Sequence, residues 1–178
     1  NPGDEIIIMD IDQVIVGNVD EIIGYPVGDN ELVSYNKWWG GDSKYRHKSV
    51  SLNGGFYKFK SGHCKSIWDT YIRSPKDWQL NYYLKGIVHY KYFGEQNFVE
   101  EMCRKNDIKI TLMNPEWICK LTNDKVQDRE NQLTYIKEFN KDYMILDKPH
   151  EDIKIVHFAN PHAAMHTSDY EWIKDYWK

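Results

Sequence analysis

The sequence predicts an α/β protein, in which short strands alternate with amphipathic helices. The first observation is the run 5–9, whose isoleucines and methionine are typical of a central, buried parallel strand. Apolar residues then recur at helical spacing in 63–73 and 95–105. Short apolar runs at 108–112 and 153–158 have the length of strands. This alternation of strands and helices defines the α/β class.

The remaining elements are predicted from shorter patterns. Residues 24–46 combine Gly, Asn, Asp and aromatic residues, so we expect a long loop there, of the kind that usually carries function. The inner side of the helix at 63–73 is expected to contain Ile67, Trp68, Tyr71 and Ile72. The other expected elements are a strand at 14–16, a helical turn at 19–23, a strand at 49–59 interrupted by Asn53-Gly54-Gly55, and helices at 130–143 and 170–177.

Length, charge and cysteine content narrow the class of protein. The chain has 178 residues, enough for a single domain over residues 1–178 with its own core. The net charge of −4 argues against nucleic acid as a partner, since such binding needs clustered Lys and Arg. An odd number of cysteines, 3, without a CxxC pair predicts reduced thiols and a cytoplasmic location. Neither a signal peptide nor a transmembrane segment is expected.

Two acidic residues, Asp10 and Asp12, directly follow the apolar run at 5–9. Alternation along a strand would place both carboxylates on one face, at the carboxyl end of the strand, where open α/β sheets bind ligands. Two close carboxylates repel each other, and a divalent cation such as Mg²⁺ or Mn²⁺ relieves that repulsion. The pattern therefore predicts a metal site, and both cations also chelate diphosphate groups.

Two Asp residues after an apolar strand are also typical of a second kind of chemistry, the hydrolysis of phosphate esters. Phosphohydrolases of the haloacid dehalogenase class also carry a hydrophobic strand followed by DxDx(T/V), and the residues from Asp10 to Val14 fit that pattern. By this resemblance Asp10 would be the nucleophile and Asp12 the general acid and base. The class also needs a later strand that ends in paired acids, and Leu146-Asp147 offers only one acid.

The continuation of the motif favours a different family. Residues 8–22 read IMDIDQVIVGNVDEI, that is, the Asp pair followed by aliphatic residues, a small residue, Asn and an acidic turn. This order resembles the core motif of glycogenin-like and galactosyltransferase-like enzymes, the family 8 glycosyltransferases of the GT-A fold. Three later segments resemble landmarks of that family, in the family's order: Asn53-Gly54-Gly55-Phe56, Gly94-Glu95-Gln96-Asn97 and Ile155-Val156-His157-Phe158-Ala159-Asn160-Pro161.

The resemblance implies a fold and an activity. The fold would be GT-A-like, with three α/β/α layers around a mostly parallel sheet. The activity would be transfer of a sugar from a nucleotide-sugar donor to a carbohydrate or glycoconjugate acceptor, with retention of configuration. Family members carry a nucleobase-binding part before this motif, so the chain is expected to be truncated at its N-terminus. A non-catalytic binding module is the alternative, and a complete chain could be an oligomer.

The same resemblance assigns roles to residues. His157 would be the third metal ligand beside Asp10 and Asp12, and an imidazole ligand favours Mn²⁺ over Mg²⁺. Catalytic roles would fall to Glu95, which orients sugar hydroxyls, and to Gln96, which lies beside the anomeric carbon.

Other residues would bind the substrates. Asn53, Gly54 and Gly55 would approach the donor sugar, since Gly permits close contact and the Asn amide bonds hydroxyls. The chemistry of aromatic rings suggests Trp38 and Trp39 as stacking platforms for the acceptor, although such residues equally often plug a loop onto the core. The family's diphosphate-neutralising lysine is absent, and His162 or His166 could take its place.

Overall fold

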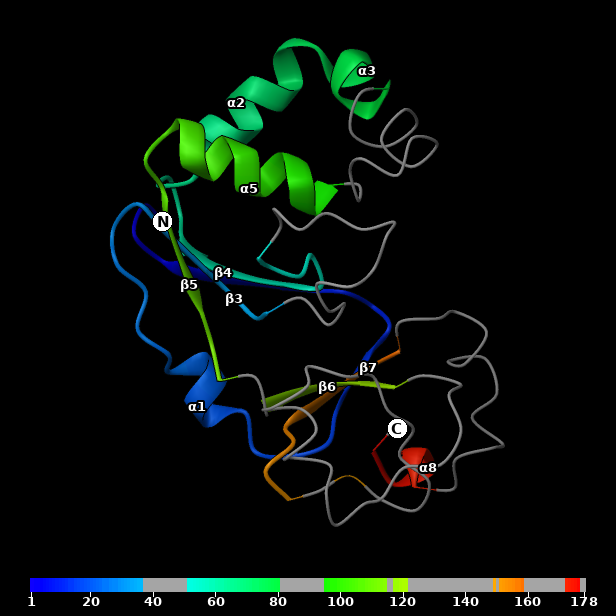
Figure 1. The fold of residues 1–178 in the computed structure, drawn as a ribbon. Helices are drawn as coiled ribbons and strands as arrows, with labels where there is room; N and C mark the ends of the chain where they lie inside the picture. Colours follow the sequence, from blue (N-terminus) through cyan, green and yellow to red (C-terminus); the bar gives the residue numbers. More distant parts are fainter. Residues whose placement is uncertain are drawn as a thin grey trace. The chain divides into compact units, whose positions relative to one another are not determined.

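The structure, a computed structural model, describes residues 1–36, 51–80, 95–114, 117–121, 149, 151–158 and 172–176. The chain divides into two compact units. Unit 1 consists of Asn1–Ile8, Pro26–Lys37 and Gly41–Met113, and unit 2 of Met9–Tyr25, Trp38–Gly40 and Asn114–Lys178. Figure 1 follows the helices and strands along the chain. A single domain over residues 1–178 stays a prediction.

Unit 1 is built on a mixed four-stranded sheet with the order β1-β4-β3-β5. Its strands are β1 (Glu5–Met9), β3 (Glu31–Ser34), β4 (Phe56–Lys60) and β5 (Lys109–Leu112). β3 runs antiparallel to β4 and parallel to β5, which places Leu32 opposite Phe59 on one side and Ile110 on the other. Every residue of β3 is buried, so this strand forms the interior of the sheet.

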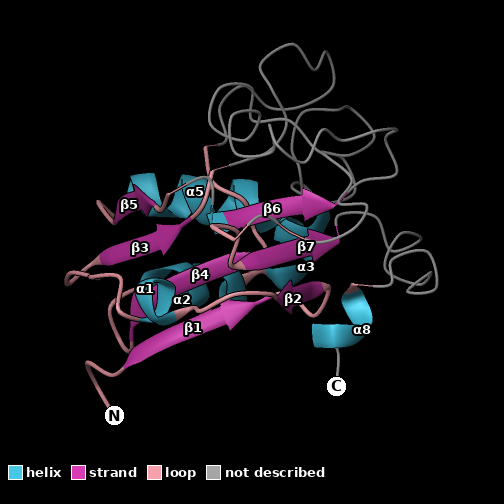
Figure 2. Cartoon of the chain, turned by 90° about the horizontal axis from the view of Figure 1, so that it is seen from below, coloured by secondary structure: helices cyan, strands magenta, loops and turns pink. Residues whose placement is uncertain are grey.

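Helices α2 (Lys65–Arg73), α3 (Pro75–Trp78) and α5 (Glu95–Lys105) complete unit 1. Figure 1 shows α2 and α5 on the same face of the sheet, and Figure 2 gives the view turned by 90°. The apolar stripe of α5 is buried, as its helical spacing predicts, and its core members are Phe98, Met102 and Cys103. They contribute to two core clusters, one with Leu32, Leu52, Cys64 and Ile108 around Cys103, and one with Phe98 against Met102.

Unit 2 contains a three-stranded sheet with the order β2-β7-β6. Its strands are β2 (Gln13–Ile15), β6 (Ile118–Leu121) and β7 (Ile155–Phe158). β7 is buried along its whole length and pairs antiparallel with β2 and parallel with β6. Two short helices, α1 (Asp20–Ile23) and α8 (Ile173–Tyr176), belong to the same unit.

The mixed α/β class predicted from the sequence is confirmed, and several helices and strands fall where they were expected. α5 occupies the expected residues, and the strand predicted at 153–158 is β7. The helix expected at 130–143 lies outside the described residues. Within the described ranges, no helix has the length and apolar character that crossing a membrane requires.

Three expectations about individual elements are wrong. β1 is at the edge of its sheet and not at the centre, and Ile8 on it is 49% exposed. The loop expected at 24–46 contains the buried strand β3. On α2, Trp68 and Ile72 point outward with 59% and 51% exposed, because the core takes up only the neighbouring side of the helix.

Candidate metal centre

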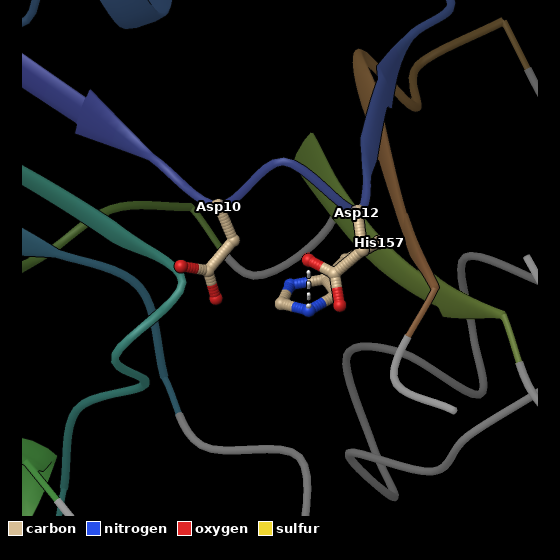
Figure 3. Close-up of side chains that lie close together, drawn as sticks. All are labelled: Asp10, Asp12 and His157. Carbon is tan, nitrogen blue, oxygen red and sulfur yellow. Dashed lines mark ion pairs between the residues drawn. The ribbon is translucent and has the colours of Figure 1, made fainter. Parts of the chain in front are cut away.

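The side chains of Asp10, Asp12 and His157 lie together in unit 2 (Figure 3). A carboxylate oxygen from each Asp and a ring nitrogen from His157 all lie within 4.8 Å of one another. His157 is buried, Asp12 is half-buried and Asp10 is exposed. The cluster is therefore anchored in the protein interior at His157 and reaches solvent at Asp10.

A turn and a strand pair bring these residues together. β1 ends at Met9, and Ile11 and Asp12 form a turn before β2 begins at Gln13. Because β2 pairs with β7, Gln13 stands directly opposite His157. The Phe158 N–H also donates a hydrogen bond of 2.8 Å to the carbonyl of Asp12, which ties the turn to β7. The backbone thus holds Asp12 next to the imidazole ring.

The expected reason for the closeness of Asp10 and Asp12 is wrong. Strand alternation does not apply, because β1 stops at Met9 and both residues lie in its connection to β2. Ile11 between them is 97% exposed, which suits a turn and not a buried strand. The turn, and not the pleat of a strand, brings the two carboxylates to His157 (Figure 3).

Among the described residues, one carboxylate oxygen of the cluster is buried and accepts no hydrogen bond. Oδ1 of Asp12 is shielded from solvent and accepts no hydrogen bond from them, although Nε2 of His157 lies 3.3 Å away. A buried acceptor without a hydrogen bond costs about 1–3 kcal/mol. A bound cation would use this oxygen and would also relieve the repulsion between the two carboxylates. Two carboxylates and one imidazole are a donor set that fits a divalent metal ion.

The two segments expected to bind the donor sugar meet in unit 1. The Gly54 N–H donates a hydrogen bond of 2.9 Å to Oε1 of Gln96 at the start of α5. Oδ1 of Asn53 accepts hydrogen bonds from the Tyr35 hydroxyl at 3.0 Å and from the Gly55 N–H at 2.8 Å. The side-chain oxygen of Gln96 therefore joins the start of α5 to the turn at Gly54, although the two are distant in the sequence. The side-chain oxygen of Asn53 likewise joins Tyr35 to Gly55.

These hydrogen bonds give Asn53 and Gln96 a structural task. Both residues are buried, and their side-chain oxygens hold the turn at Gly54 and Gly55 in place. Glu95 is exposed, and its carboxylate lies against Gly54, where a Cβ atom would collide with it. Gly54 therefore permits the close approach of Glu95. The roles of these residues toward a sugar stay predictions.

Trp38, Trp39, His162 and His166 lie outside the described residues, and so does Gly94. Asp147, the position that the dehalogenase-like alternative would need for its later acids, is outside them as well. That alternative therefore stays open.

Gln13 is a residue of the centre that the sequence did not indicate. Its amide nitrogen lies 3.0 Å from Nδ1 of His157. The contact depends on the pairing of β2 with β7, two strands that are far apart in the chain. Only the pairing register, which the sequence does not reveal, could have pointed to it.

Comparison of the chain with protein-family models finds no match, and neither does comparison with curated proteins. The function must therefore be argued from the chain's own residues and their geometry.

Proposed function

We propose that the chain is a metal-dependent glycosyltransferase that moves a sugar from a nucleotide-diphosphate sugar to a carbohydrate or glycoconjugate acceptor. The observation that carries this proposal is the cluster of Asp10, Asp12 and His157. These residues come from two segments that each resemble part of one family's metal site, and the fold brings them to one place. An incidental pair of surface acids would not require a buried histidine from a distant strand.

The proposed cation is Mn²⁺, with Mg²⁺ as the alternative, since imidazole suits Mn²⁺ better. When bound, the cation would act as a Lewis acid that stabilises the departing nucleoside diphosphate. Asp10 and Asp12 provide the negative charge that attracts it. His157 provides a ligand whose position is fixed by burial in β7.

The donor sugar would be bound by the turn at Asn53-Gly54-Gly55 and the start of α5. Within this group the carboxylate of Glu95 is at the surface, so Glu95 is the proposed partner of sugar hydroxyls. Asn53 and Gln96 would act mainly by holding the turn that carries it. The proposal includes a GT-A-like fold with a mostly parallel sheet and transfer with retention of configuration.

Measurement of cation binding tests the metal site on which the proposal depends. We expect Mn²⁺ to bind the wild-type protein and to raise its melting temperature, with a further rise when a nucleotide sugar is added. Asp12→Asn should weaken Mn²⁺ binding on the order of tenfold or more, since one charged ligand is lost. Asp175→Asn is the matched control, because Asp175 is an exposed carboxylate of α8 in the same unit, outside the cluster.

The reaction is then assayed as release of nucleoside diphosphate from a panel of nucleotide sugars. Turnover that requires Mn²⁺ and is lost in Asp12→Asn would support the transferase. Equal Mn²⁺ affinity in wild type and Asp12→Asn would refute the metal site. Hydrolysis of an aryl phosphate that depends on Asp10 and Mg²⁺ would instead favour the dehalogenase-like phosphohydrolase.

A further inference from the structure

The imidazole ring of His157 is contacted at both of its nitrogen atoms. Nε2 faces Asp12, with 3.3 Å to Oδ1, and Nδ1 lies 3.0 Å from the amide nitrogen of Gln13. The second contact follows from the strand register, since Gln13 on β2 is the direct cross-strand partner of His157 on β7. Only 7% of the His157 side chain is exposed, so protein groups set the orientation of the ring.

The contact with Gln13 decides which ring nitrogen carries the proton. An amide nitrogen only donates hydrogen bonds, so Nδ1 of His157 must accept one. A neutral ring then carries its proton on Nε2, the ring nitrogen that lies 3.3 Å from Oδ1 of Asp12. This placement is electrostatically favourable, because the negative carboxylate attracts the proton on Nε2. An unprotonated Nε2 would instead direct its lone pair at the carboxylate, and the two would repel each other.

A cation at the cluster requires the opposite arrangement. A metal-bound Nε2 offers its lone pair to the ion, so the proton of the neutral ring resides on Nδ1. Nδ1–H then needs an acceptor. The Gln13 amide provides one when it turns over and presents Oε1 in place of its nitrogen, a change that leaves the pairing of β2 and β7 intact.

We propose that Gln13 is the positioning residue of the metal centre: its amide donates to Nδ1 of His157 without the cation and accepts from Nδ1 with it. The inference rests on the proposed metal site and adds the group that orients one of its ligands. A carboxylate at this position could only accept, and an apolar side chain could do neither. A glutamine amide can do both, so it can bond Nδ1 of His157 whether the cation is bound or released.

The position of the proton tests this role directly. Ring ¹⁵N shifts of His157 are measured in cation-free protein and with Zn²⁺, a diamagnetic probe that leaves NMR signals sharp. We expect the proton on Nε2 without Zn²⁺ and on Nδ1 with it. Gln13→Met keeps the length of the side chain but removes both bonding atoms, and should give a mixture of tautomers in the cation-free protein. Ile15→Met, on the same strand opposite Ile155, is the control and should behave as wild type.

Cation affinity provides the second measurement. Loss of a group that orients a metal ligand typically weakens binding about 10–100-fold, so Gln13→Met should bind Zn²⁺ and Mn²⁺ more weakly by this factor. Ile15→Met should retain wild-type affinity. If Gln13→Met does not fold, Gln13→Asn, whose amide is one methylene too short to reach the ring, provides the same comparison.

Each outcome bears on a different claim. A cation-free wild-type ring with its proton on Nδ1, or a Gln13→Met variant with wild-type tautomer and affinity, would overturn the role of Gln13. A wild-type protein with the expected cation-free tautomer, lost in Gln13→Met, but without affinity for either cation would overturn the proposed function. That result would still support Gln13 as the group that orients His157.

Discussion

Replacement of Glu31 by glutamine should lower the free energy of unfolding at neutral pH and flatten its dependence on pH. Glu31 lies on the central strand β3 and is 7% exposed. Its carboxylate accepts a hydrogen bond of 2.6 Å from the Gly28 N–H, another from the Thr111 hydroxyl, and pairs with Lys109 at 2.7 Å. Burial favours the neutral acid, but the contacts with Lys109, Thr111 and Gly28 outweigh it and lower the pKa from 4.5 to about 2.

The sign and size of the effect follow from that pKa. Because the folded-state pKa of Glu31 lies below the unfolded value, its contribution is fully present above about pH 4.5 and is lost as the pH falls toward 2. The difference between the two pKa values corresponds to about 3 kcal/mol. Lys109 is 71% exposed, and screening by solvent reduces the expected contribution to about 2 kcal/mol.

Urea unfolding of wild type and Glu31→Gln, measured between pH 7 and pH 3, checks this expectation. The difference in unfolding free energy should be about 2 kcal/mol at pH 7 and should shrink steadily below about pH 4.5. Asp69→Asn is the control, since Asp69 forms an exposed pair with Lys65 and its loss should change stability by less than about 1 kcal/mol. A difference between wild type and Glu31→Gln that is the same at every pH would refute the reasoning.

Two further changes probe the turn of unit 1. Gly54→Ala should displace the Glu95 carboxylate, whose flexible end can move aside, so nucleotide-sugar affinity should fall while Mn²⁺ affinity measured by calorimetry stays unchanged. An unaltered nucleotide-sugar affinity would argue against Glu95 as a sugar ligand. Tyr35→Phe removes the buried hydrogen bond to Asn53, and urea unfolding should show a loss of about 1 kcal/mol. A variant as stable as wild type would mean that the hydrogen bond from Gly55 satisfies Asn53 by itself.

The sequence predicts best those elements whose pattern is local. The stripe of Phe98, Met102 and Cys103 identifies α5, because helical spacing is visible within eleven residues. β3 escapes prediction because its first residue, Glu31, is a buried acid that depends on Lys109 and Thr111. These partners come from β5, so no local pattern explains why a charged residue begins a buried strand.

The same distinction between local pattern and distant pairing holds for the candidate metal centre. Asp10, Asp12 and His157 could be predicted, because each lies in a short motif with chemical meaning. The way they meet could not be predicted, since it depends on a turn after β1 and on the register that places Gln13 opposite His157. Pairing between distant strands is decided by the whole fold and not by the strands themselves.

Unit 2 combines segments that come before and after most of unit 1 in the sequence. The paired residues Gln13 and His157 are 144 positions apart, so a cation held by Asp12 and His157 would close a very long loop. A link of this kind restricts the unfolded chain in the manner of a disulfide, and theory gives the largest gain to the longest loops. The centre would then serve as a reversible staple between the early and late parts of the chain.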